Sequence, residues 1–94
     1  MNEKSQLDYA VEACTIAANQ YAIPDATQEA RYMAADDALN ELQAIELSAL
    51  NNEERTTLLQ TVNYLATLLT RVGDPTLKPL LTQILLINVA IGLS

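Results

Sequence analysis

Four acidic residues in one short stretch form the densest group of reactive side chains in this sequence: Glu29, Asp36, Asp37 and Glu41. Carboxylate oxygens are the ligands that hard cations prefer, so a metal site is the first chemistry to consider. A metal site in a helical protein needs carboxylates that project inward from facing helices, commonly with histidine, and this chain contains no His. We therefore expect a solvated acidic face here, with no metal and no cofactor.

Cys14 is the single cysteine and the next candidate for chemistry. It has no basic neighbour in the sequence, and there is no histidine to lower its pKa, so an activated thiolate is not expected. One cysteine cannot form a disulfide within the chain, and zinc sites of His and Cys cannot be assembled. We expect Cys14 to be a core packing residue, the setting to be reducing and cytoplasmic, and the protein not to be an enzyme.

The elements that would position these residues are helices. Half of the 94 residues are apolar, yet Phe and Trp are absent, and two Gly and three Pro offer little turn chemistry for a β protein. The length suits one domain with its own core. We expect a single all-α domain over residues 1–94.

The first helix is expected from about Ser5 to Ala22, where Ile23-Pro24 ends it. Apolar residues recur at alternating steps of four and three, which places them on one face: Leu7, Val11, Cys14, Ala18 and Tyr21. A second, weaker apolar row lies away from this stripe: Tyr9, Ala13 and Ile16. The pattern leaves open whether that row is ordinary surface or a further contact face.

The second helix is expected to follow Asp25 as its N-cap, with Gln28 at the spacing of a capping-box partner. Its apolar stripe extends past residue 45, so the helix is expected to end at Glu46 or later: Ala35, Ala38, Leu42, Ile45 and Ala49. The four acids named above project from the opposite side.

The third helix is expected to begin after Asn51, because Glu54 stands at capping-box spacing, and to end at Gly73. Its stripe again steps by four and three: Leu58, Val62, Leu65, Leu69 and Val72. Asp74-Pro75-Thr76 predicts a turn, with Thr76 as the cap of a fourth helix that runs from about Leu77 to near the C-terminus. These four helices with short connections predict a four-helix antiparallel bundle; two helical hairpins that close as a dimer fit the same pattern.

The last helix carries no charge after Lys78. As a helix, Leu80 to Leu93 would extend about 21 Å, short of a hydrocarbon core of about 30 Å, so we expect no membrane span. Its apolar residues form two nearly opposite rows, the first Leu80, Ile84, Ile87 and Ile91, and the second Leu86, Val89 and Leu93. A bundle of this size can bury only one of them, and the second row therefore points to a protein partner or a homo-oligomer, most simply a homodimer.

The net charge of −7 is unevenly distributed. Residues 1–54 contain eleven acids against Lys4 and Arg31, a balance of −9, whereas the remainder has a balance of +2. Such a field repels nucleic acid and anionic lipid and favours a basic partner. Asp8 and Glu12 also interrupt the apolar stretch that a secretory signal would need.

These patterns favour a non-catalytic protein–protein interaction module of adaptor, chaperone or inhibitor type. The expected partner-binding residues are Leu86, Val89 and Leu93 for affinity, with Glu29, Asp36, Asp37 and Glu41 for charge complementarity. Two alternatives remain open. The acidic half could mimic nucleic-acid phosphates and block a DNA- or RNA-binding protein, or the chain could be a structural subunit of a larger assembly.

Overall fold

Four α-helices account for most of residues 5–93, which are the residues that the computed structural model describes. They are α1 (Gln6–Ala22), α2 (Gln28–Gln43), α3 (Asn52–Val72) and α4 (Lys78–Leu93). Two short 3₁₀ turns, η1 (Leu47–Ala49) and η2 (Pro75–Leu77), lie in the connections, and no β-strand occurs in this range. The expected all-α fold is confirmed.

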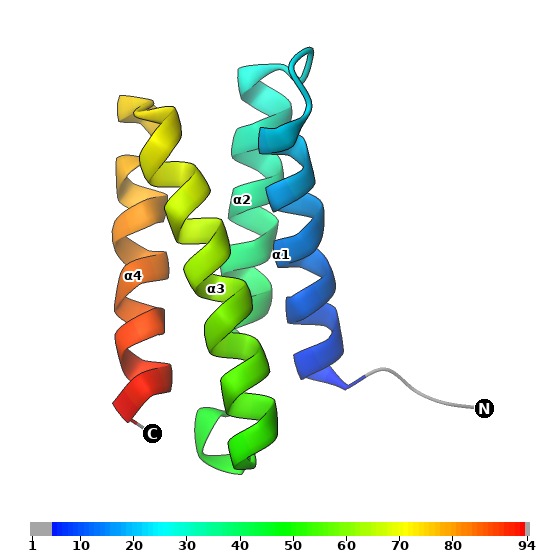
Figure 1. Ribbon diagram of the computed structural model, residues 1–94, viewed down its shortest axis with the longest axis vertical. Helices are drawn as coiled ribbons and strands as arrows, with labels where there is room; N and C mark the ends of the chain where they lie inside the picture. The colour runs from blue at the N-terminus through cyan, green and yellow to red at the C-terminus, as the bar shows by residue number, and fades with distance from the viewer. Residues whose placement is uncertain (1–4, 94) are drawn as a thin grey trace, which may run out of the picture.

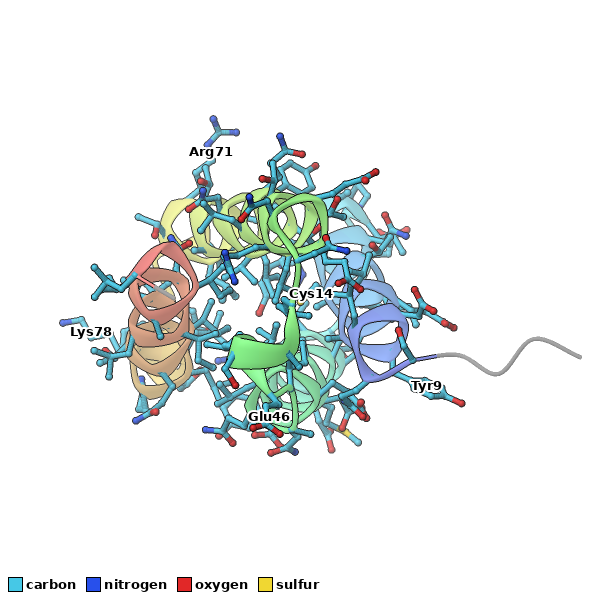
Figure 2. The ribbon with its side chains drawn as sticks, turned by 90° about the horizontal axis from the view of Figure 1, so that it is seen from below. Tyr9, Cys14, Glu46, Arg71 and Lys78 are labelled. Carbon is cyan, nitrogen blue, oxygen red and sulfur yellow. The ribbon has the colours of Figure 1, made fainter. Side chains whose placement is uncertain are left out.

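The helices form two antiparallel hairpins, α1–α2 and α3–α4, that pack side by side (Figure 1). Helix α3 contacts both α1 and α4, while α4 has a smaller contact with α2. Viewed along the bundle, α1 and α4 lie at opposite edges, and the segment that carries Glu46 crosses the end between α2 and α3 (Figure 2). The four-helix bundle therefore closes within one copy of the chain.

The core lies around α3, whose Leu58, Val62, Leu65 and Leu69 are almost completely buried. The hairpin α1–α2 contributes mainly small side chains to it, which allows the two helices to approach closely. These small buried residues are Ala10, Cys14, Ala17, Ala35 and Ala38. Helix α4 adds Leu80, Ile84 and Ile91 from one side only.

Local capping signals place the ends of α1 and α3. Ser5 and Asp8 form a capping box at α1, and Asn51 and Glu54 form the expected one at α3. Gly73 ends α3 with a φ of 67°, a left-handed conformation that glycine adopts without strain. The boundaries predicted for these two helices are confirmed.

The boundaries predicted for α2 are wrong at both ends. Thr27, not Asp25, is the N-cap, because its side chain accepts a hydrogen bond from the Ala30 amide at 3.0 Å. The helix ends at Gln43 rather than at Glu46 or later. Ala49 lies in η1 and is exposed, so the stripe that predicted a longer helix instead continues into a connection.

The turn before α4 also differs from the prediction. Thr76 does not cap α4 but lies inside η2, whose N-cap is Asp74; the Asp74 carboxylate accepts hydrogen bonds from the Thr76 amide at 2.9 Å and the Thr76 hydroxyl at 2.8 Å. This bonding stabilises η2, so α4 begins at Lys78. Val72, expected in the core stripe of α3, is exposed at the end of that helix.

Candidate functional site: two apolar surfaces on opposite sides of the bundle

The outer side of α4 is an exposed apolar row, and it contains the three residues expected there. Leu86, Val89 and Leu93 have exposed fractions of 60%, 59% and 83%. Leu85 is also exposed beside them, although the sequence pattern did not single it out. We call these four residues the outer row of α4.

The opposite side of the same helix is core. Leu80, Ile84 and Ile91 are buried, and Ile87 is partly buried against the same cluster. Across the contact with α3, the Asn88 side-chain amide donates a hydrogen bond to the side-chain oxygen of Asn63. The two rows expected from the sequence thus have different environments, one packed and one exposed.

By length and composition alone, the segment Pro75–Leu93 could also cross a membrane. The sequence argument counted only the uncharged part after Lys78, whereas this segment begins at η2 and is 19 residues long. About a fifth of its most apolar window is buried inside the bundle, which is the row described above. Core helices of soluble proteins can have the same composition, but they are mostly buried, whereas most of this window is exposed.

The acidic residues of α2 do not share one uniform face. Glu29 and Asp37 are exposed, whereas Asp36 and Glu41 are half-buried. The Glu41 carboxylate accepts a hydrogen bond of 2.7 Å from Gln6 on α1, whose amide also reaches the Glu41 carbonyl at 3.0 Å. Glu41 therefore belongs to the junction of α1 and α2, and Asp37 lines the same junction, away from the outer row of α4.

An open groove of about 690 Å³ runs along this junction. Its apolar lining comes from the second row of α1, Tyr9, Ala13 and Ile16, and from Ala30, Met33 and Ala34 of α2. Ile16 and Met33 are 50% and 58% exposed, so the groove has apolar walls in contact with solvent. Acidic side chains lie along the same groove: Glu12, Asp37 and Glu41. We call it the α1–α2 groove.

Sequence reasoning missed half of this groove. The off-stripe row of α1 indicated one wall, but the facing residues of α2 were not identified because they are interspersed with acids. Met33 was the available signal, since a large apolar side chain on the acidic side of an amphipathic helix is out of pattern.

Arg31 holds the other end of this hairpin together. Its guanidinium donates to the backbone carbonyls of Gln20, at 3.1 Å, and Ile23, at 2.9 Å, and lies 5.5 Å from the centre of the Tyr21 ring. The Gln20 carbonyl has no helical partner because Pro24, four residues on, has no N–H, and a cation is favourable at this end of α1; the Ile23 carbonyl also accepts from the Ala26 amide at 3.3 Å. Burial raises the pKa of the Tyr21 hydroxyl to about 12.

The acidic residues and Cys14 do not lie in environments that favour metal binding or thiol chemistry. Among residues 5–93, no three Cys, Asp or Glu side chains gather closely enough to hold a metal ion. Cys14 lies in the core, as expected, and burial raises the pKa of its thiol from 9.0 to about 12. A thiol with such a pKa remains protonated and is a poor nucleophile at neutral pH.

The chain matches no family model, no curated protein and no solved structure. The two surfaces described above are therefore the features from which a function can be inferred.

Proposed function

We propose that this protein is a non-catalytic protein–protein interaction module that associates through the outer row of α4. The observation that supports this most is the exposure of Leu86, Val89 and Leu93 on a helix whose opposite side packs into the core. An uncharged, contiguous apolar helix face is typical of a contact surface. The acidic α1–α2 hairpin gives the module a second surface with a different character.

We further propose a second copy of the chain as the first occupant of the outer row. The four residues of the outer row expose the equivalent of about two and a half fully exposed aliphatic side chains, worth about 4–7 kcal/mol when buried. A symmetric dimer would bury it twice, for about 8–14 kcal/mol, against an association cost of about 4–15 kcal/mol. A dissociation constant of tens of micromolar needs a net gain of about 6 kcal/mol, which lies within the range of this balance, so we expect a reversible dimer and not an obligate one.

The charge distribution is compatible with that arrangement. Residues 5–50, which include α1 and α2, contain eight acidic residues and one basic residue, whereas the single charged residue of α4 is Lys78. Helix α1 lies at the edge of the bundle opposite α4 (Figure 2). Two copies that meet at α4 would therefore keep much of their like charge apart, which reduces repulsion.

The test is a comparison of two double variants by light scattering behind size exclusion. Leu86→Glu with Val89→Glu places two charges on the outer row. Gln60→Glu with Thr67→Glu adds the same charge at exposed positions of α3. We expect the wild type and the α3 variant to shift toward twice the monomer mass as concentration rises through tens of micromolar, and the α4 variant to remain monomeric with unchanged helicity.

Three results would contradict the proposal. If the wild type remains monomeric up to millimolar concentration, the outer row does not bind a second copy. If wild-type chain floats with neutral lipid vesicles while the α4 variant does not, the row contacts lipid instead. Loss of folding in the α4 variant would show that the row is part of the core.

A further inference from the structure

The α1–α2 groove has a shape into which a helix can pack. Its lining includes three alanines, Ala13, Ala30 and Ala34, between the larger side chains of Ile16 and Met33. Small residues between two antiparallel helices leave a channel into which the side-chain ridge of another helix can pack. Recognition of an amphipathic helix in such a groove uses apolar anchors at steps of three and four residues.

The acidic side chains around the groove favour a helix that carries basic residues. Asp37 and Glu41 line it from α2, and Glu12 lines it from α1. The single base within residues 5–50 is Arg31, whose guanidinium is bonded to the end of α1. The potential over the groove is therefore negative, which favours lysine and arginine beside the apolar anchors of an occupant.

A second copy of this chain does not meet that description. The whole sequence contains five basic residues, and they are spread over Lys4, Arg31, Arg55, Arg71 and Lys78. Within residues 5–93, the exposed apolar row of α4 is accompanied by one base, Lys78, and the apolar stripe of α3, the helix that carries Arg55 and Arg71, is buried in the core. The occupant must come from a different protein.

We propose that the α1–α2 groove binds a basic amphipathic helix of a partner protein, with its apolar side chains on Ile16 and Met33 and its bases at Asp37 and Glu41. This deepens the proposed function, because it names the partner class of an interaction module, but it does not depend on the outer row of α4. The two surfaces belong to different edges of the bundle, so one chain can self-associate through α4 while it holds the partner helix.

The probe is a fluorescently labelled helical peptide of leucine and lysine, with leucines spaced at three and four residues along one face. A peptide with glutamate at every lysine position has the same apolar face and opposite charge, and a scrambled lysine peptide has the same charge without the face. Anisotropy titrations with the full chain should show binding of the basic amphipathic peptide and at least tenfold weaker binding of the other two. The affinity should fall as salt is raised, because the acids contribute through screened charge.

Substitutions in the α1–α2 groove test whether the peptide binds there. Ile16→Ser with Met33→Ser should weaken binding about tenfold or more, since two half-exposed anchors are lost. Asp37→Lys should weaken binding of the peptide about three- to tenfold. Asp25→Lys makes an equal charge change in the turn before α2, and it should weaken binding by less than about two- to threefold. Circular dichroism and urea unfolding establish that each variant retains its fold.

The Leu86→Glu, Val89→Glu variant separates this inference from the proposed function. It should bind the basic peptide like the wild type even when it no longer self-associates. If it loses the peptide, the peptide binds α4, and the groove assignment is wrong. Equal affinity for the basic and acidic peptides, or no effect of the Ile16, Met33 variant, would also overturn it.

Discussion

Replacing Ile84 and Leu86, two residues apart on α4, by alanine should have very different effects on stability. Ile84 is completely buried in the core cluster, whereas Leu86 is 60% exposed in the outer row. The two substitutions remove the same number of carbon atoms from the same helix. The difference between the two losses of unfolding free energy therefore measures how much more tightly one side of α4 is packed than the other.

The expected magnitudes follow from burial. Ile84→Ala loses the transfer free energy of three carbons and leaves a cavity, for about 3 kcal/mol. Leu86→Ala loses less than half of the transfer free energy and leaves no cavity, for about 0.5–1 kcal/mol. A chain of this size has about 5–14 kcal/mol of stability, so the Ile84 variant should still fold.

Urea unfolding followed by circular dichroism measures both values. It is performed at a few micromolar or less, because dimer formation would add stability through Leu86. With a slope of about 1–1.5 kcal/mol/M, the midpoint should fall by about 2–3 M for Ile84→Ala and by less than 1 M for Leu86→Ala. If the folded population of Ile84→Ala is too small, Ile84→Val replaces it, and the losses are compared per carbon removed: about 1 kcal/mol at Ile84 against about 0.2–0.3 kcal/mol at Leu86. Equal losses for Ile84→Ala and Leu86→Ala under these conditions would refute the reasoning, since Leu86 would then be packed in the monomer.

Two ionisable groups yield further predictions. Burial raises the pKa of Cys14 from 9.0 to about 12, so its thiol stabilises the fold fully below pH 9 and the contribution is lost as pH rises toward 12. The loss should reach about 2 kcal/mol at pH 10.5, and the slope of unfolding free energy against pH between 9 and 10.5 should be smaller in Cys14→Ala. Hydrogen bonds from the Thr76 backbone, then its hydroxyl and then Gln28, lower the pKa of Asp74 below 3.8, so its contribution is present above that value and is lost as pH falls through the lowered one. Asp74→Asn should therefore reduce stability at pH 7 and reduce the loss of stability in acid unfolding; an unchanged acid profile would contradict this role.

The helix boundaries set by local hydrogen bonds could be predicted from the sequence. The Asn51–Glu54 capping box and the left-handed Gly73 involve residues within one turn of the helix end, so their spacing contains the necessary information. The start of α2 could not be decided in this way. Asp25 and Thr27 are both good caps, and the choice depends on how the whole hairpin turn is built, including the bonds from Arg31 to the end of α1.

The two surfaces differ in how far the sequence predicts them. The outer row of α4 follows from the periodicity of one helix, because two opposed apolar rows cannot both face one core. The α1–α2 groove depends on which residues of α2 lie beside Tyr9 and Ile16, and that pairing is tertiary. Contacts such as Gln6 with Glu41, 35 residues apart, fix it and have no local signature.

A dilution series of nuclear magnetic resonance amide spectra tests the central claim most directly, because it detects self-association and locates it. Between about 20 μM and 1 mM, a range that covers the tens of micromolar at which the dimer should form, we predict concentration-dependent shifts at Leu85, Leu86, Val89 and Leu93, with the amides of α1 unchanged. Spectra that do not change over this range, or shifts that cluster away from α4, would contradict the claim that the outer row is the surface through which this protein associates.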